Sequence, residues 1–194
     1  MKTGRIIILS GPSGAGKTTL HDLLLKSPAF KGRIIRSISA TTRKPRGQER
    51  HGREYLFLTR RMFEHRIRTG QFLEWMQVFD HYYGTPMKNV RAALKKNKHV
   101  LLCIDVKGAL LVKKKCPEAL MIFVKAPSLK ELRRRLEARK TDLKESVMLR
   151  LKTAREELKK VDQYDHVLVN DRLDLALVRL TGILQQELGG SHRR

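Results

Sequence analysis

A glycine-rich segment near the start of the chain has the residue types and spacing that bind a phosphate chain. It has the form G-x-x-x-x-G-K-[ST] and reads Gly11, Pro12, Ser13, Gly14, Ala15, Gly16, Lys17, Thr18. Backbone N–H groups of such a loop converge on phosphate oxygens, and the start of a following helix adds positive potential. Lys17 then reaches the β- and γ-phosphates, and the Thr18 hydroxyl faces Mg²⁺. The segment predicts a nucleoside triphosphate site.

The residues on either side of this loop have the character that the site requires. Residues 5–10 form a short apolar run, typical of a buried parallel strand. After Lys17, the leucines at 20, 23 and 24 share one face of an expected helix. A chance glycine-rich turn has no reason to follow a strand and open a helix, so the context favours the phosphate loop.

The composition is that of a globular chain of about one domain. The chain has 194 residues, of which 41% are hydrophobic, so it can bury a core. Cys103 and Cys116 offer no disulfide framework, which indicates a reducing compartment. No apolar run approaches the length of a membrane span, and the first is too short for a signal peptide. We expect a cytoplasmic protein without a membrane partner.

The formal net charge of +23 is extreme for this length. Its basic clusters lie at residues 60–61, 95–96, 113–115 and 133–135, with no aromatic residues between them and no nucleic-acid motif. We therefore expect no specific nucleic-acid partner, although non-specific binding at low salt is expected. The cations either handle anionic substrates or form a solvated surface.

Apolar strands alternate with helical periodicity along most of the chain. After the first strand and helix, further strands are expected at residues 100–105, 120–124 and 166–169, and further helices at 90–94, 129–136, 147–158 and 173–188. Such alternation predicts an α/β fold, with a parallel sheet and helices on both of its faces.

Two segments interrupt the alternation. Residues 38–86 contain short strand-like pieces and are expected to form an inserted subdomain. Residues 128–158 predict two charged helices with capping signals, Ser128 with Glu131 and Asp142 with Glu145. A charged helical hairpin beside a nucleotide site is expected to act as a mobile lid. The core then consists of residues 1–37, 87–127 and 159–194.

The segment Ser39 to Arg46, SATTRKPR, resembles the guanylate kinase signature S-x-T-T-R-x-P-R. Further family motifs follow in order: Gly52-Arg53-Glu54-Tyr55, Phe72-Leu73-Glu74-Trp75, Tyr82-Tyr83-Gly84-Thr85, Arg135 to Arg139, Arg150 and Val169-Asn170-Asp171. The resemblance runs over about residues 5–188. It implies a P-loop kinase that transfers the ATP γ-phosphoryl group to GMP, and to dGMP, in guanine nucleotide metabolism. It also implies a core, a GMP-binding subdomain and a lid.

The resemblance assigns the GMP side of the site. Arg43 and Arg46 hold the GMP phosphate together with the hydroxyls of Tyr55 and Tyr83, and a guanidinium grips phosphate oxygens two at a time. Glu74 reads guanine, because a carboxylate accepts from N1–H and the N2 amine at once. The smaller base contacts are Ser39 and Thr85.

The resemblance also assigns the ATP side. Arg135, Arg139 and Arg150 lie on the lid and close over the ATP phosphates, while Asn170 meets the ATP base. Transfer between two phosphates needs no general base, since the attacking GMP phosphate is already anionic. The residues expected to carry catalysis are Lys17, Arg43, Arg139 and Arg150.

One residue departs from the family pattern near the metal. The family has Asp-x-Asp after the third core strand, whereas this chain has Cys103 in the first position and keeps only Asp105. Asp105 is then the one carboxylate at that strand end that orients the waters of Mg²⁺.

Other functions are weighed against this one. A non-catalytic guanylate-kinase-like module that binds phosphopeptides is the alternative from another class, but such modules have typically lost the phosphate loop and the lid arginines. A related kinase for another small phosphorylated substrate is a further alternative, against which Glu74, Ser39 and Thr85 argue. The sequence leaves open whether the protein is a monomer or a homodimer.

Overall fold

A computed structural model describes residues 4–78, 80–138 and 144–189. By its internal contacts the chain forms two compact units. Unit 1 comprises Met1–Ile7, Gly32–Leu102 and Lys107–Leu120, and unit 2 comprises Ile8–Lys31, Cys103–Val106 and Met121–Arg194. The predicted division into core, subdomain and lid differs from these units and stays a prediction.

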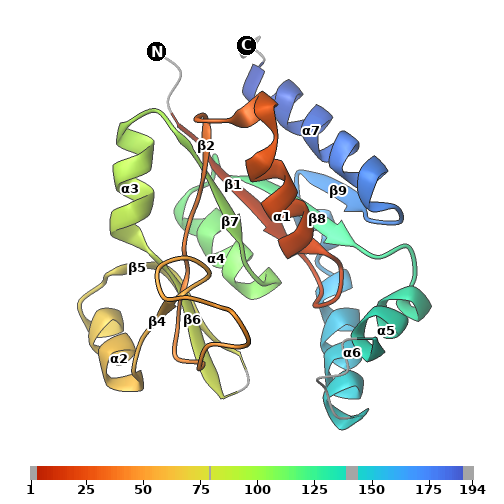
Figure 1. Ribbon diagram of the computed structural model, residues 1–194, viewed down its shortest axis with the longest axis horizontal. Helices are drawn as coiled ribbons and strands as arrows, with labels where there is room; N and C mark the ends of the chain where they lie inside the picture. The colour runs from red at the N-terminus through yellow and green to blue at the C-terminus, as the bar shows by residue number, and fades with distance from the viewer. Residues whose placement is uncertain (1–3, 79, 139–143, 190–194) are drawn as a thin grey trace. The chain divides into compact units, whose positions relative to one another are not determined.

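Unit 1 contains most of the β-structure. Its elements, drawn in Figure 1, are β2 (Ile34–Arg36), β3 (Ala40–Thr41), β4 (Leu56–Phe57), α2 (Arg60–Arg68), β5 (Phe72–Val78), β6 (His81–Pro86), α3 (Met87–Lys95), nearly all of β7 (His99–Cys103) and α4 (Val106–Lys115). Four of the strands form a small sheet in the order β4-β3-β6-β5. In that sheet β5 and β6 are antiparallel, and so are β3 and β6.

Unit 2 begins within β1 (Ile6–Ser10), whose first two residues belong to unit 1. Its other elements are α1 (Lys17–Lys26), all but the first residue of β8 (Leu120–Lys125), α5 (Leu129–Glu137), α6 (Lys144–Leu158), β9 (His166–Val169), α7 (Leu173–Gly189) and the short 3₁₀ turns Pro28–Phe30 and Val161–Gln163. Here α1 packs on α7, and α5 packs on α6 (Figure 1). The α5–α6 contact is apolar, with Leu132 and Leu136 of α5 against Val147 and Ala154 of α6.

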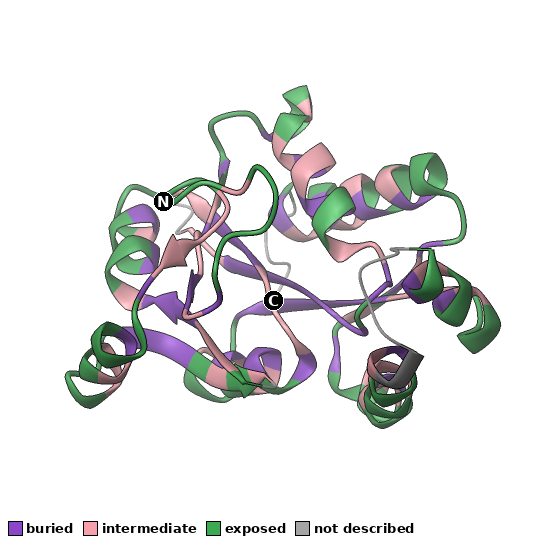
Figure 2. Cartoon of the chain, turned by 60° about the horizontal axis from the view of Figure 1, so that its bottom comes forward, coloured by how far each residue is buried: buried purple, intermediate pink, exposed green. Residues whose placement is uncertain are grey.

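The larger sheet has the strand order β2-β7-β1-β8-β9, and its β2–β7 and β8–β9 pairs are parallel. Every residue of β1 is buried, and so are the first five of β8, which explains their continuous apolar sequences. The purple strands at the centre of Figure 2 show this burial. The prediction of an α/β fold with a parallel sheet flanked by helices is confirmed.

Several elements differ from the prediction. The strand expected at residues 100–105 ends at Cys103, and the Ile104 N–H then bonds to the Leu9 carbonyl at 3.3 Å. The sequence pattern gave no sign of β2, β6, α2 or α4. β6 contains Gly84 and Pro86, residues that usually mark turns, and α2 fully buries only Phe63.

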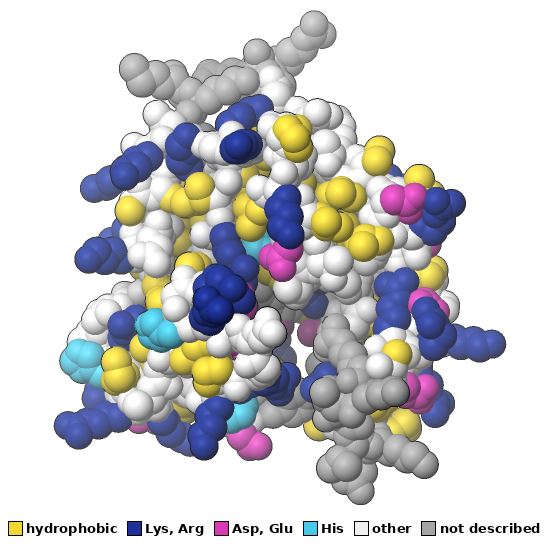
Figure 3. Space-filling model, in the orientation of Figure 1, with side chains coloured by type: hydrophobic (Ala, Val, Ile, Leu, Met, Phe, Trp, Pro, Cys, Tyr) yellow, Lys and Arg dark blue, Asp and Glu magenta, His cyan; other side chains and the backbone are white. Residues whose placement is uncertain are grey.

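Two features of the surface bear on function. Among the described residues, no helix is both long and apolar enough to cross a lipid bilayer. Lys and Arg side chains lie over much of the face that Figure 3 shows, as the net charge of +23 requires.

Candidate active site

The phosphate loop connects β1 to α1 within unit 2, as the sequence predicted. Gly16, the N-cap of α1, has φ 88°, and Gly11 has φ 133°, so both lie in the backbone region that favours glycine. A Cβ on Gly11 would collide with the Val124 carbonyl, and one on Gly16 would collide with the Asn170 amide nitrogen. The motif glycines are therefore required by close packing as well as by the turn.

Lys17 lies across the loop that it follows in sequence. Its ammonium donates hydrogen bonds to the carbonyls of Gly11 at 2.5 Å and Pro12 at 2.9 Å. The Thr18 side chain is exposed at the start of α1. The loop thus holds its cation on neutral backbone oxygens, which an anionic ligand can replace without leaving a buried charge unpaired.

Asn170 braces the loop from the end of β9. Its side chain is buried, and its amide donates to the Ala15 carbonyl at 2.9 Å. Arg135 of α5 donates to the Asn170 carbonyl at 2.9 Å and to Glu131 at 2.7 Å. The two residues line a hollow of about 320 Å³, whose other walls are Gly14, Gly16, Thr19, Asp171 and Leu173. Two of the predicted ATP contacts therefore lie together beside the phosphate loop.

The structure describes some of the remaining predicted lid residues and not others. Ser128 caps α5 as predicted, because the Glu131 N–H donates to its hydroxyl at 3.1 Å. Arg150 lies on α6 and is half-buried. Arg139 and the predicted cap of Asp142 with Glu145 lie outside the side chains that the structure describes.

Asp105 follows β7 and is half-buried, like Cys103 two residues earlier. Burial raises the pKa of the neighbouring Tyr164, and the charges of Glu157 and Asp105 act in the same direction. The Tyr164 hydroxyl donates to Ser10 at the end of β1, at 3.1 Å. Asp105 therefore lies near the strand end from which the phosphate loop starts.

The guanine side of the predicted site lies on one face of the small sheet in unit 1. Glu74 of β5 is paired with Thr85 of β6, and the Thr85 hydroxyl donates to the Glu74 carboxylate at 2.6 Å. Glu74 is only 4% exposed. Tyr83, two residues before Thr85 in β6, points to the same face and is roughly 6–7 Å further along the strand. A carboxylate has about four acceptor positions, so a buried one that accepts from a Thr hydroxyl can accept from more than one donor.

A register shift holds Glu74 in this place. The ladder between β5 and β6 is irregular between Phe72 and Glu74, which leaves the Leu73 carbonyl outside the regular pairing. Lys115, at the end of α4, donates to that carbonyl at 2.6 Å. The strand thus keeps its backbone bonded while it presents Glu74 to the buried face.

The phosphate side of the same half-site is built around Arg43. The guanidinium carbon of Arg43 lies 5.4 Å from the ring centre of Tyr55 and 5.9 Å from that of Phe57. Tyr55 meets Tyr83 edge to face, with ring centres 6.1 Å apart. Arg43 is only 7% exposed. Three of the four predicted phosphate ligands are therefore neighbours.

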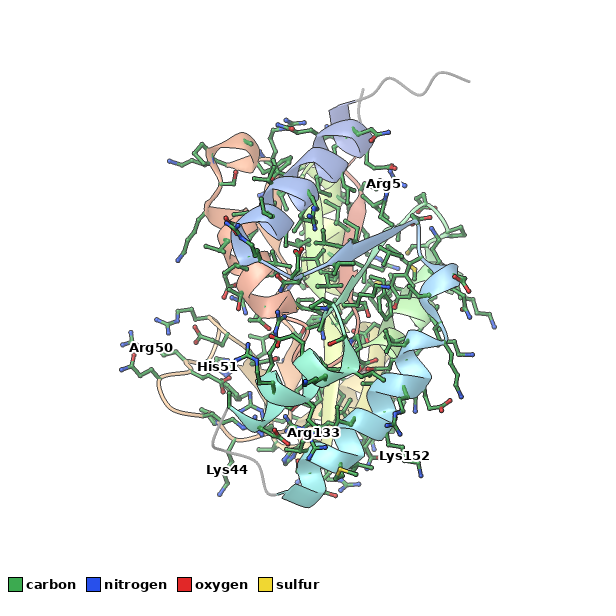
Figure 4. All side chains as sticks on the ribbon, turned by 90° about the vertical axis from the view of Figure 1, so that its right-hand side faces the viewer. Arg5, Lys44, Arg50, His51, Arg133 and Lys152 are labelled. Carbon is green, nitrogen blue, oxygen red and sulfur yellow. The ribbon has the colours of Figure 1, made fainter. Side chains whose placement is uncertain are left out.

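Arg46 and Ser39 complete the predicted set. The Arg46 side chain is exposed, and Ser39 is half-buried beside β3, where its carbonyl accepts from the Leu56 N–H at 2.9 Å. Lys44 and Arg50, labelled in Figure 4, project outward from the same loop.

Glu49 is a residue of this half-site that the sequence reasoning missed. Its carboxylate accepts from both terminal nitrogens of Arg43, at 2.9 and 3.0 Å, and from the Arg46 N–H at 2.8 Å. Burial acts to lower the pKa of Arg43, but hydrogen bonds with Glu49 and Tyr83 outweigh it and raise that pKa. The signal available in the sequence was an acid three residues after Arg46, in a chain with 42 basic and 19 acidic residues.

The donor set near the phosphate loop is compatible with a hard divalent cation. Thr18 offers an exposed hydroxyl, and Asp105 offers a carboxylate. Mg²⁺ prefers oxygen ligands, and it usually binds through one or two protein groups, substrate phosphates and water. The residues present therefore fit a Mg²⁺ ion that arrives with a triphosphate.

A parallel sheet with a phosphate loop between its first strand and helix defines the core of a P-loop phosphotransferase. The family model of guanylate kinase matches residues 3–187. The guanylate kinase of Rubrobacter xylanophilus is 45% identical over 190 residues, which cover 98% of each chain. That of Caldanaerobacter subterraneus subsp. tengcongensis is 43% identical, over 96% of this chain and 89% of its own. The chain belongs to the guanylate kinase family.

A solved structure agrees with this assignment. The crystal structure of guanylate kinase from Anaplasma phagocytophilum superimposes with a TM-score of 0.81 at 31% identity. The match covers 98% of this chain and 89% of that one.

Proposed function

We propose that the protein catalyses the reaction of its family, the transfer of the ATP γ-phosphoryl group to GMP, with the residues described above. The observation that carries the assignment of roles is the buried pair of Glu74 and Thr85 on the same sheet face as Tyr83, which itself hydrogen-bonds with Arg43. That face offers acceptors at one end and cations with hydroxyls at the other. A guanine base and a phosphate require these groups at the two ends of one nucleotide.

The GMP half-site binds and orients the phosphate acceptor. The Glu74 carboxylate accepts guanine N1–H and the N2 amine, which adenine cannot supply together. Arg43, Arg46, Tyr55 and Tyr83 hold the phosphate, leaving one of its oxygens to attack. The attacking oxygen is already anionic, so no side chain needs to remove a proton.

The phosphate-loop half-site holds the donor. Backbone N–H groups of residues 11–18 and the start of α1 cradle the triphosphate, and Lys17 moves from the Gly11 and Pro12 carbonyls to the β- and γ-phosphates. Thr18 and, through water, Asp105 would hold Mg²⁺, which supplies neutralisation of charge on the phosphates. The ATP base enters the hollow beside Asn170. Arg135, which lines the same hollow, closes over the phosphates together with Arg139 and Arg150.

The substrates suggest where the enzyme works. Both are nucleotides of the cell interior, and the cysteines at 103 and 116 are not joined in a disulfide. We therefore place the activity in the cytoplasm, in guanine nucleotide metabolism, and include dGMP as an acceptor because no proposed contact requires the ribose 2′-hydroxyl.

A coupled assay of ADP formation tests the proposal directly. With ATP and Mg²⁺ we expect turnover with GMP and dGMP, and none of comparable kcat/KM with AMP, UMP or CMP. Equal turnover of AMP and GMP would contradict the role of Glu74. Tight binding of a phosphopeptide without any turnover of GMP would favour the non-catalytic alternative.

A further inference from the structure

The buried cation of the GMP half-site is locked by a carboxylate. The Glu49 side chain is 23% exposed and that of Arg43 is 8% exposed, so most of this ion pair is withdrawn from water. A buried guanidinium without a partner is costly, and a bidentate carboxylate is its most specific partner. Glu49 therefore restrains the Arg43 side chain more strongly than the partner in an exposed ion pair would.

The same carboxylate closes the loop that carries both arginines. It accepts from the Arg46 N–H at 2.8 Å, and the Glu49 N–H donates back to the Arg46 carbonyl at 3.0 Å. Arg43 also donates to the Lys44 carbonyl at 2.7 Å. The Glu49 side chain thus links the guanidinium of Arg43 to the backbone of Arg46.

The N–H donors of Arg43 divide between two edges of its guanidinium. Nη1 donates to Glu49 and to the Lys44 carbonyl, and Nη2 donates to the other Glu49 oxygen. Nε and the second Nη2 hydrogen form the other fork of the guanidinium, whose spacing matches two phosphate oxygens. Tyr83, a proposed phosphate ligand, also hydrogen-bonds with Arg43.

Two roles for Glu49 are conceivable, and they predict opposite effects. As an internal anion in the place of the phosphate, it would compete with GMP and have to leave. As a support, it would stay and present the second fork of Arg43. The two bonds to Arg43 and the bond to Arg46 favour the support, because departure of Glu49 would break all three together.

We infer that Glu49 is a positioning residue, which holds Arg43 and the Arg46 loop in the geometry that receives the GMP phosphate. This inference rests on the proposed function of the half-site and adds to it a residue that does not touch the substrate. Its effect is specific to the phosphate end of the nucleotide, since no contact of Glu49 reaches Glu74 or Thr85.

Binding of GMP and of guanosine to Glu49→Ala tests the inference. We expect the Kd of GMP to rise about 10- to 100-fold, the cost typical of misplacing a positioning group by about 1 Å. The Kd of guanosine, which has no phosphate, and the KM of ATP should stay within about twofold, since the predicted base contacts and the phosphate loop are untouched. Glu49→Gln keeps one acceptor oxygen and should fall between Ala and the wild type.

The matched control is Glu64→Ala. Glu64 pairs with the exposed Arg60 within α2 at 2.9 Å and touches no proposed phosphate ligand, so GMP binding should not change. Thermal melting identifies a variant that does not fold, and Glu49→Gln then serves as the test in place of Glu49→Ala.

Several outcomes would overturn the inference. Tighter binding of GMP by Glu49→Ala would show that Glu49 competes with the phosphate. Unchanged binding would show that Glu49 has no influence on the phosphate site. A parallel loss of GMP and guanosine would show a general structural role. If the wild type itself bound GMP no better than guanosine, the proposed function of the half-site would fail, which is distinguishable from failure of Glu49 alone.

Discussion

The two proposed half-sites each offer a cation to an anionic substrate, and the partners that hold these two cations differ. In the phosphate loop Lys17 is held by the carbonyls of Gly11 and Pro12, whereas in the small sheet Arg43 is held by the carboxylate of Glu49. Carbonyls are neutral and can release a lysine to a phosphate. A carboxylate binds one edge of an arginine firmly and leaves the other edge for the ligand.

This difference suits the two substrates. In the proposed reaction Lys17 follows a phosphoryl group that changes its charge and partner during transfer, and a flexible ammonium can do so. In the same proposal Arg43 holds one phosphate in a fixed direction, and a planar guanidinium fixed by Glu49, Tyr55 and Phe57 suits that role. We therefore expect changes in the phosphate loop to affect turnover most, and changes in the small sheet to affect GMP binding most.

The largest effect is expected from Lys17→Met. It removes the cation aimed at the transferring group, and should lower kcat at least about 100-fold, while the Kd of GMP stays unchanged. Coupled ADP assays and calorimetry measure the two quantities. Lys26→Met, at the exposed end of α1, is the control. Unchanged turnover in Lys17→Met would count decisively against the mechanism.

Glu74→Gln should have the next largest effect. It replaces one acceptor with a donor that faces a donor of guanine, and a mispaired buried polar group costs about 1–3 kcal/mol, or roughly 5- to 150-fold in kcat/KM for GMP. The ATP KM should hardly move. Steady-state kinetics with each substrate varied would decide, and equal losses for GMP and ATP would make Glu74 a structural residue.

Asp105→Asn probes the metal end of the phosphate loop. If Asp105 alone orients the waters of Mg²⁺, the variant should need more Mg²⁺ for its half-maximal rate and lose about 10- to 100-fold overall. Cys103→Asp should shift the Mg²⁺ requirement downward with the GMP KM nearly unchanged. A Mg²⁺ titration of the three proteins is the measurement. Wild-type behaviour of Asp105→Asn would leave the metal to Thr18 and the phosphates.

The smallest expected effect is on folding stability, because the contribution of the Glu49 carboxylate to that stability depends on pH. The hydrogen bond with Arg43 holds the pKa of this carboxyl below its ordinary value of 4.5. A lowered pKa in the folded state means that the stabilisation is present above about pH 4.5 and is lost as the pH falls below it. Melting temperatures of wild type and Glu49→Gln should differ by about 2–4 °C for each kcal/mol involved at pH 7. The difference should shrink at pH 3; a constant difference would contradict the ion pair.

The phosphate-loop half-site could be predicted well because most of it is local in sequence. Residues 11–18 are contiguous, and the strand before them and the helix after them have clear periodicity. Even here the brace from Asn170 to the Ala15 carbonyl spans 155 positions, and sequence reasoning gave Asn170 only a contact with the ATP base.

The GMP half-site could be predicted only as a set of residues carried over from the family signature. Its elements are short: β3 and β4 have two residues each, and β6 contains both Gly84 and Pro86. Such strands have too few residues for a period to be read, so tertiary pairing decides them. The helix α2 was missed for a related reason, since its nine residues fully bury only Phe63.

The sequence by itself determined the ligand class, the α/β fold and the family, because contiguous motifs and long apolar periods fix local backbone geometry. Only the tertiary structure decided which polar groups meet. It brought Thr85 to Glu74, Lys115 to the Leu73 carbonyl, and Glu49 to both Arg43 and the backbone of Arg46. The physical reason is that a buried charge or carbonyl must find a partner, and the chain's path through space, rather than its local pattern, determines which partner is within reach.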